Sequence, residues 1–390
     1  MQKKNPLVIV LSPRIQVAME ILMGATDYAH RFGPWNIHPI EIGDWNGQSW
    51  RWEDWHADGL ILGAEISGSV ASRIRLARLP TVLIQVTSKM NAPSFPLSGA
   101  PRCLYDSNAC GRMAARHFIA QGYRNFAFVD YSCAHDYWSV SRERSFRREL
   151  LARAAAANYF RYGSASKTEQ ANWMVERPRL IAWLQRLPTP CAVFAANDRR
   201  ALQVSEACRF GGISVPDRIA ILGVDDDHWF CNASTPTLSS IRLNTREAGF
   251  AIAGVLADLM NGRRRTRKIV PVSPLEVVTR QSTDWFAVAD KKVALALQCI
   301  HGDFADPGFS IARLARLTGL ARRTLELRFR NTTGKTIHEE VERVRLAHIA
   351  SLLRERKHSR QELMQKSGYR SFSALDRAMK RFSLRAPITA

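Results

Sequence analysis

The sequence feature that most constrains the fold is a pattern near the C-terminus that occurs twice, about 50 residues apart. In each copy a serine precedes a short apolar helical pattern, a glycine follows it, and a second helical pattern begins within a few residues. The first copy runs from Ser310 through Gly319 to Arg330, and the second from Ser359 through Gly368 to Phe382. A serine hydroxyl accepts hydrogen bonds from free N–H groups in the first turn of a helix, and glycine adopts the left-handed backbone that ends one. The repeat therefore predicts two helix-turn-helix units in tandem.

The second helix of each unit has a narrow apolar stripe on an otherwise polar and basic surface. Leu325 and Phe329 in the first unit, and Leu375 and Met379 in the second, are spaced four residues apart and so share one buried face. Two ordinary helical hairpins would show the same stripe. Residues 290–390, however, hold 21 Lys+Arg against 10 Asp+Glu, within a chain of net charge +21. Because dense positive charge attracts phosphate with salt-sensitive affinity, the repetition, the caps and the charge together favour DNA binding.

With these residues, the last hundred positions resemble the AraC-type DNA-binding domain, in which a long helix joins two helix-turn-helix units. Thr336 to Arg356 is similar to that linker helix, and its apolar residues available for burial are Ile337, Val341, Val344, Leu346 and Ile349. The resemblance implies that the second helices enter successive major grooves of double-stranded operator DNA, about 34 Å apart. The residues it assigns to DNA are Arg322, Arg323, Thr324, Glu326 and Arg330 in the first unit, and Ser373, Asp376 and Arg377 in the second. We expect Arg323 and Arg377 to read bases and Arg330 to contact phosphate.

Some 285 residues with a different sequence pattern precede this tail. In them, short apolar runs alternate with helical stretches. The apolar runs are Leu7–Leu11, Gly59–Leu62, Thr81–Val86, Phe126–Val129, Cys191–Ala195 and Ile219–Val224. The helical stretches are Gln16–Ala29, Ser69–Ala77, Arg142–Ala157 and Ala201–Phe210. Strands without polar alternation, separated by helices, predict a parallel sheet covered on both faces. The expected fold class is α/β over residues 1–284 and all-α over residues 285–390.

Several short motifs in this region resemble, in their order, the ligand domain of LacI-type regulators, which is periplasmic-binding-protein-like and has two lobes. They are Ala57-Asp-Gly-Leu-Ile-Leu62, Tyr105-Asp-Ser-Asn-Ala, His117-Phe-Ile-Ala-Gln-Gly122, Ala195-Ala-Asn-Asp198, Gly212-Ile-Ser-Val-Pro216 and Arg280-Gln-Ser-Thr283. A LacI-like sensor followed by an AraC-like tail is the arrangement of xylose-operon activators. The resemblance implies a sugar-responsive transcription regulator, an activator of a carbohydrate-utilisation operon.

We expect the ligand of such a sensor in the cleft between its lobes, outside the carboxyl ends of the strands. Arg142, Asp198 and Asp225 match the ligand-contacting motifs of the family. A carboxylate accepts hydrogen bonds from two hydroxyls and a guanidinium donates a fork of them, as sugar binding requires. For each residue a surface ion pair or a helix cap is the alternative role. Further candidates are Trp138 and Trp229, for stacking on a sugar ring, and Ser12, for a polar contact; for the two tryptophans a place in the core is the alternative role.

Other classes of protein are disfavoured by what the sequence does not contain. It has no Gly-x-Ser-x-Gly, Walker or dinucleotide-binding motif and no His or Cys set with catalytic spacing, so we expect neither an enzyme nor a cofactor. The 7 cysteines are scattered without Cys-x-x-Cys spacing, which predicts neither a disulfide framework nor a metal site. The apolar run Leu7–Leu11 is too short for a signal peptide, and no run approaches the roughly 18 apolar residues of a membrane span. We therefore expect a cytoplasmic protein with no membrane partner.

Two rival functions remain beside a ligand-gated regulator. A solute-binding protein of a transport system is disfavoured by the missing signal peptide and the basic tail. A DNA-binding protein that has lost its ligand would show the same sequence features, and only a binding assay separates the two. The partners that we expect are operator DNA, a small sugar effector (xylose-like or another monosaccharide), RNA polymerase and a second copy of the chain in a homodimer.

Overall fold

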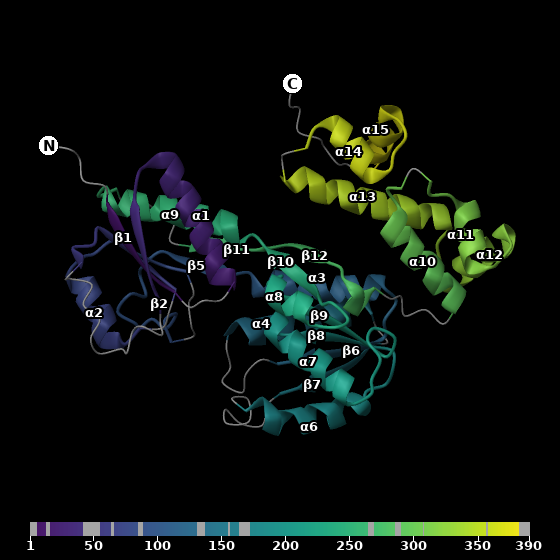
Figure 1. Ribbon diagram of the computed structural model, residues 1–390, viewed down its shortest axis with the longest axis horizontal. Helices are drawn as coiled ribbons and strands as arrows, with labels where there is room; N and C mark the ends of the chain where they lie inside the picture. The colour runs from purple at the N-terminus through teal and green to yellow at the C-terminus, as the bar shows by residue number, and fades with distance from the viewer. Residues whose placement is uncertain are drawn as a thin grey trace.

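A computed structural model of the chain shows two α/β lobes followed by a helical tail (Figure 1). It describes residues 6–12, 16–41, 55–63, 66–84, 89–130, 137–154, 157–163, 172–263, 269–284, 290–306, 308–355 and 358–381. The predicted combination of a two-lobed α/β part and an all-α C-terminal part with two helix-turn-helix units is confirmed. No helix in the part of the chain that the structure describes is long and apolar enough to cross a membrane.

The first lobe contains a six-stranded sheet in the order β11-β5-β4-β3-β1-β2. Its strands are β1 (Leu7–Ser12), β2 (Asn36–Glu41), β3 (Gly59–Leu62), β4 (Thr81–Leu83), β5 (Arg102–Tyr105) and β11 (Ile269–Val272). All their pairings are parallel, as the unbroken apolar runs predict. The helices of this lobe are α1 (Gln16–Phe32), α2 (Gly68–Leu76) and α9 (Thr245–Met260). Helices α1 and α9 cross at backbone contact, because a Cβ atom added at Gly249 would lie 1.9 Å from the Ile21 carbonyl oxygen.

The second lobe contains another six-stranded sheet, in the order β12-β10-β9-β8-β6-β7. Its strands are β6 (Asn125–Val129), β7 (Asn158–Tyr162), β8 (Cys191–Ala195), β9 (Ile219–Val224), β10 (Ser239–Leu243) and β12 (Pro274–Val278). The pairings are parallel except that β12 runs antiparallel to β10. The helices of this lobe are α3 (Ser107–Ala120), α4 (Tyr137–Arg153), α6 (Trp173–Gln185), α7 (Asp198–Phe210), α8 (His228–Ala233) and the 3-10 turn η3 (Gln281–Thr283).

The chain passes between the lobes three times, after β5, after β10 and after β11. The three crossings lie side by side. The Asp106 N–H donates to the Val272 carbonyl at 2.8 Å, and the Asn244 N–H donates to the Ser273 carbonyl at 3.0 Å. In return, the Ser273 N–H donates to Asn244 Oδ1 at 2.6 Å. The connection between the lobes is thus a hydrogen-bonded bundle of three segments and not three separate linkers.

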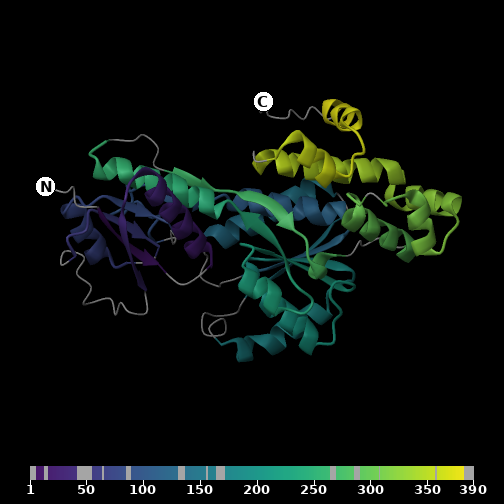
Figure 2. The ribbon, with the colours of Figure 1, turned by 45° about the horizontal axis from the view of Figure 1, so that its top comes forward.

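The tail consists of α10 (Lys291–Asp303), α11 (Ile311–Thr318), α12 (Arg322–Thr333), α13 (Ile337–Glu355), α14 (Arg360–Ser367) and α15 (Phe372–Arg381). The predicted caps are present: the Ser310 and Ser359 hydroxyls each accept a first-turn N–H, and the left-handed Gly319 and Gly368 end α11 and α14. Helix α13 occupies the predicted linker, and the five apolar residues proposed for burial in it are 8% exposed or less. Figure 2 shows α13 between the two units, with α14 and α15 at one end and α10 to α12 at the other.

Candidate functional site

The predicted ligand residues Arg142 and Asp225 lie next to each other in the second lobe. Arg142 projects from α4 and is 3% exposed. Its Nη1 donates to the Ala196 carbonyl, just beyond the end of β8, and its Nη2 lies 3.6 Å from Asp225 Oδ1, just beyond the end of β9. Both groups therefore meet at the carboxyl edge of the sheet, where ligands of open α/β sheets bind.

The electrostatics of this pair are unusual for an aspartate. Burial raises the pKa of Asp225 to about 6, the nearby Arg142 guanidinium opposes the rise, and the Asp227 carboxylate adds to it. A carboxyl with a pKa so close to neutrality, beside an arginine whose buried Nε has no hydrogen-bond partner among the described residues, is typical of a binding site. Trp138, one turn before Arg142, places its ring 4.9 Å from the Arg142 guanidinium. This cation–π contact places the guanidinium over an aromatic face.

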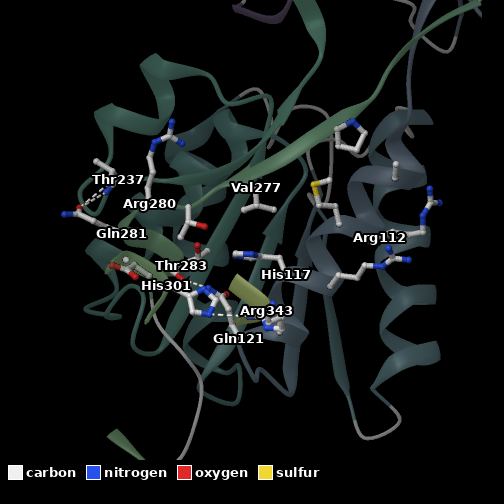
Figure 3. Close-up of a pocket in the computed structure, with 18 of the residues that line it drawn as sticks. Arg112, His117, Gln121, Thr237, Val277, Arg280, Gln281, Thr283, His301 and Arg343 are labelled. Carbon is white, nitrogen blue, oxygen red and sulfur yellow. Dashed lines mark hydrogen bonds between the residues drawn. The ribbon is translucent and has the colours of Figure 1, made fainter. Parts of the chain in front are cut away.

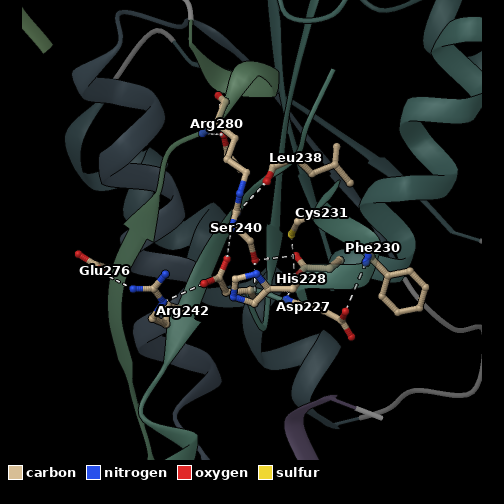
Figure 4. Close-up of polar contacts among 12 residues, drawn as sticks. Asp227, His228, Phe230, Cys231, Leu238, Ser240, Arg242, Glu276 and Arg280 are labelled. Atoms are coloured by element: carbon tan, nitrogen blue, oxygen red, sulfur yellow. Dashed lines mark hydrogen bonds and ion pairs between the residues drawn. The ribbon is translucent and has the colours of Figure 1, made fainter. Parts of the chain in front are cut away.

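The turn that carries Asp225 is held in a rare backbone conformation. Asp225 and Asp226 have φ values of 110° and 52°, which cost energy for residues other than glycine. The Asp226 carboxylate accepts from Arg242 Nε at 2.8 Å and from Arg280 Nη2 at 2.7 Å. The Asp226 N–H donates to Ser240 Oγ at 2.9 Å. Figure 4 shows Arg242, Arg280 and Ser240 converging on this turn, which is therefore fixed by contacts outside itself.

Asp198, the third predicted ligand residue, is used differently. It is the first residue of α7 and only 1% exposed. Its Oδ1 accepts from Ser240 Oγ at 2.6 Å, and its Oδ2 accepts from the Asp227 N–H at 2.7 Å and from Cys231 Sγ at 3.5 Å. Burial, with the charge of Asp225, raises its pKa well above the usual range. Both oxygens thus bond to the protein, which supports a role in positioning the Asp225 turn.

The sequence analysis did not select Asn197, although it immediately precedes Asp198. Asn197 is half-buried at the carboxyl end of β8, next to the carbonyl that Arg142 contacts. Its Oδ1 accepts the Arg200 N–H at 2.9 Å and so caps α7, while its amide NH₂ keeps two donors. The signal that would have found it is its place directly after an apolar strand run. We add Asn197 to the candidate ligand residues.

The two remaining candidates are less informative. Trp229 lies on α8 and is 77% exposed, so it is not a core residue. Ser12 ends β1 in the other lobe, and its side chain lies outside the described part of the chain. A direct contact joins the lobes near these residues, because the His228 N–H donates to Gln16 Oε1 of α1 at 3.2 Å.

The second helix of each helix-turn-helix unit presents its predicted polar face to solvent. Leu325, Phe329, Leu375 and Met379 are 6% exposed or less, as predicted. Of the residues assigned to DNA, Arg323, Thr324, Arg330 and Ser373 are exposed. Arg322 forms an ion pair with Glu326 at 2.9 Å, Asp376 pairs with Arg360 of α14, and Arg377 Nε donates to the Ser373 carbonyl at 3.2 Å. Arg323 is thus one assigned arginine with no intramolecular partner among the described residues.

Comparison with known proteins agrees with both halves of this architecture. Residues 115–283 match the periplasmic binding protein-like domain, and residues 314–389 match a helix-turn-helix domain. The chain is 26% identical over 372 residues to the xylose operon regulatory protein of Escherichia coli strain K12, which covers 95% of this chain and 92% of that protein. The chain is a homologue of the xylose operon regulatory proteins.

A second xylose operon regulatory protein, from Haemophilus influenzae, is 29% identical to the chain over 296 residues. The match covers 75% of this chain and 74% of that protein. The fold of the chain is similar to that of the solved structure of the xylose-binding transcription activator xylR. The TM-score is 0.62 at 24% identity, and the match covers 98% of this chain and 97% of that chain. The relatives are transcription regulators and not enzymes, in agreement with the sequence-based expectation. Arg142, Asp198 and Asp225 all fall within the matched periplasmic binding protein-like segment.

Proposed function

We propose that the chain is a sugar-responsive transcription activator, with a sensor over residues 1–284 and a DNA-binding domain over residues 285–390. The observation that carries the ligand half of this proposal is the Arg142–Asp225 pair at the carboxyl edge of the second sheet. A guanidinium and a carboxylate in this arrangement match vicinal hydroxyls of a sugar, one donating to them and the other accepting. The names of the relatives favour xylose or a similar monosaccharide as the effector.

The mechanism follows from the position of this pair at the carboxyl edge of the second sheet, on the same turn as the contact of His228 with Gln16 of the first lobe. A sugar held by Arg142, Asn197 and Asp225 contacts the first lobe only when the lobes close, so it binds the closed arrangement more tightly. Such differential affinity shifts the population toward the closed state, whereas equal affinity for both states would change nothing. In a homodimer, closure alters the spacing of the two tails and hence their fit to the operator. We further propose that the operator-bound regulator, in the cytoplasm, recruits RNA polymerase as its partner.

A thermal-shift screen tests the sensor half. We expect one monosaccharide out of xylose, arabinose, ribose and glucose to raise the melting temperature, because a ligand that binds only the folded state stabilises it. The same sugar should change the affinity of the protein for its operator in a fluorescence-anisotropy titration. If no sugar stabilises the protein while operator binding is tight, the rival function, a DNA-binding protein without a ligand, takes its place.

A further inference from the structure

The last element of the sensor, the turn η3, lies where the sensor meets the DNA-binding tail. Directly after it, the Asp284 carbonyl accepts from Gln298 Nε2 of α10 at 2.6 Å. Thr283 of η3 and Asp284 also line one cavity together with His301 of α10 and Arg343 of α13. Figure 3 shows Thr283, His301 and Arg343 gathered in one part of the view. A displacement of η3 therefore reaches the tail through the covalent chain and through the Gln298 hydrogen bond.

Buried hydrogen bonds attach η3 to the second lobe. The Ser282 hydroxyl donates to the Ile221 carbonyl of β9 at 2.6 Å and accepts the Ser239 N–H of β10 at 2.8 Å. The Thr283 hydroxyl donates to Ser239 Oγ at 2.7 Å, and the Thr283 carbonyl accepts from Gln121 Nε2 of α3 at 2.6 Å. Because so many bonds hold η3, the loss of one neighbouring side chain leaves this turn folded.

The Arg280 side chain connects η3 to the turn that carries Asp225. Arg280 directly precedes η3, and its Nη2 donates to Asp226 Oδ1 at 2.7 Å, while its Nη1 donates to the Leu238 carbonyl at 3.0 Å. Figure 4 shows the guanidinium between these two acceptors. The side chains of Arg280 and Asp226 are 15% and 4% exposed, so this charge-assisted bond is little weakened by solvent. The sugar-binding turn and the end of the sensor therefore share one buried ion pair.

The other oxygen of the Asp226 carboxylate has a partner of the same type in a different place. Arg242 Nε donates to Asp226 Oδ2 at 2.8 Å, and Arg242 Nη1 donates to Glu276 Oε1 at 2.9 Å. Arg242 lies on β10 and Glu276 on β12, so these contacts join neighbouring strands of one sheet. Arg242 thus supports the same turn as Arg280 but is not part of the segment that leads to the tail.

We propose that Arg280 transmits sugar binding from the Asp225 turn to the DNA-binding tail, an inference that rests on the proposed function of the Arg142–Asp225 site. A sugar that bonds to Asp225 acts on a turn whose positive φ values already cost energy, and so shifts the balance between its arrangements. The Asp226 carboxylate moves with the turn, Arg280 moves with that carboxylate, and η3 passes the change to α10. Arg280 is a positioning residue, because it acts through Asp226 and does not contact the sugar.

The test measures a coupling factor, defined as the ratio of the operator dissociation constants without and with saturating sugar. The operator is a site that the unchanged full chain selects from a random DNA pool. The sugar is the one among xylose, arabinose, ribose and glucose that raises the melting temperature of the unchanged protein. We expect a change of at least about fivefold in the unchanged protein and of less than about twofold in Arg280→Ala. Because the sugar is saturating in every titration, a weaker sugar affinity alone does not lower this factor.

Arg242→Ala is the matched control, because it removes an arginine from the same carboxylate. In calorimetric titrations it should weaken sugar binding about as much as Arg280→Ala does, yet it should keep the coupling factor of the unchanged protein. Gln298→Ala removes the bond from α10 to the end of the sensor, and should keep the sugar affinity while lowering the coupling factor. If Arg280→Ala does not fold, Gln298→Ala decides the question.

A full coupling factor in a folded Arg280→Ala would overturn the inference, and so would equal losses in Arg280→Ala and Arg242→Ala, which would show that any weakening of the turn has this effect. A full factor in Gln298→Ala, where Arg280→Ala does not fold, would overturn it too. Failure of the proposed function is distinguishable, because the unchanged protein then binds none of the sugars, and the inference falls with it. Linkage provides a second measurement: the operator must tighten sugar binding by the same factor in the unchanged protein, and by less than about twofold in Arg280→Ala.

Discussion

Arg142 and Asp225 face each other with 3.6 Å between Nη2 and Oδ1, which is longer than a hydrogen bond. Neither group therefore uses its full bonding capacity on the other, and a ligand hydroxyl can bond to both. We expect Arg142→Ala or Asp225→Ala to weaken sugar binding at least several-fold in calorimetric titrations. Salt-dependent DNA binding without the sugar should remain unchanged, because the DNA-binding helices lie in the tail. The exposed Arg144 on the same helix provides the control Arg144→Ala, and unchanged affinity in both site variants would remove this site.

The raised pKa of Asp225 predicts how sugar binding depends on pH. In the proposed site, sugar hydroxyls would donate to the ionised carboxylate, and with a pKa of about 6 only about one tenth of this group is ionised at pH 5. The dissociation constant should therefore be about tenfold higher at pH 5 than at pH 7.5. Asp225→Asn should bind weakly at both pH values and lose this dependence. Without ligand the sign is opposite: since the folded state holds the proton more tightly than the unfolded chain does, this group favours folding as the pH falls from about 6 toward 4.

Asp198 provides a test between positioning and direct contact. Asp198→Ala leaves the Asp227 N–H and the Ser240 hydroxyl without their acceptor, so we expect the free energy of unfolding to fall by about 3 kcal/mol in urea denaturation. Sugar affinity should fall with it, because the Asp225 turn loses a support. Ser240→Ala removes the bond to Asp198 and also the acceptor of the Asp226 N–H, and should cost about 2 kcal/mol. An Asp198→Ala protein of normal stability that no longer binds sugar would instead assign Asp198 to the ligand.

The two recognition helices should read different halves of the operator. Arg323→Ala and Arg377→Ala should each relax sequence preference at positions about ten base pairs apart, because successive major grooves are one helical turn apart. A bidentate arginine–guanine pair discriminates by about 1–3 kcal/mol, so the loss is visible in sites selected from a random DNA pool. Arg330→Ala should reduce the salt dependence of binding and keep the motif. An Arg323→Ala protein that selects the full original motif would show that Arg323 is not a base reader.

The parts of the fold that the sequence predicts well are those where a local pattern and the tertiary environment agree. Ile219–Val224 and Cys191–Ala195 were expected as strands and are fully buried strands, because each run is apolar throughout. The strand expected at Thr81–Val86 ends at Leu83. β5 was not predicted. It begins with Arg102, which reads as a surface residue, yet its guanidinium is buried and bonds to carbonyl oxygens of the preceding loop, including Leu97 O at 3.1 Å.

The site was predictable as a set of residue types but not as an arrangement. Arg142 and Asp225 are far apart in the sequence. Arg142 lies on α4, which follows β6, and Asp225 follows β9, so only the strand order β9-β8-β6 in the folded sheet brings the two residues together. Helix α4 begins at Tyr137, five residues before the predicted start at Arg142. The sequence did not reveal this first turn because it has no amphipathic stripe: Ser139 is buried there and bonded to Asp130. The roles of Asn197 and Asp198 could not be distinguished, since adjacent polar residues after a strand look alike until their hydrogen bonds are known.

The three crossings between the lobes have a consequence for how the protein is built. β11 completes the first sheet and β12 the second, although only Ser273 separates them in the chain. A fragment that ends before β11 would thus lack an edge strand of each sheet and expose the unpaired backbone of β5 and β10. Neither lobe is an independent folding unit, and the two acquire their stability together. We therefore expect a ligand that binds between them to stabilise one cooperative structure, so that both lobes unfold in a single transition at a higher temperature.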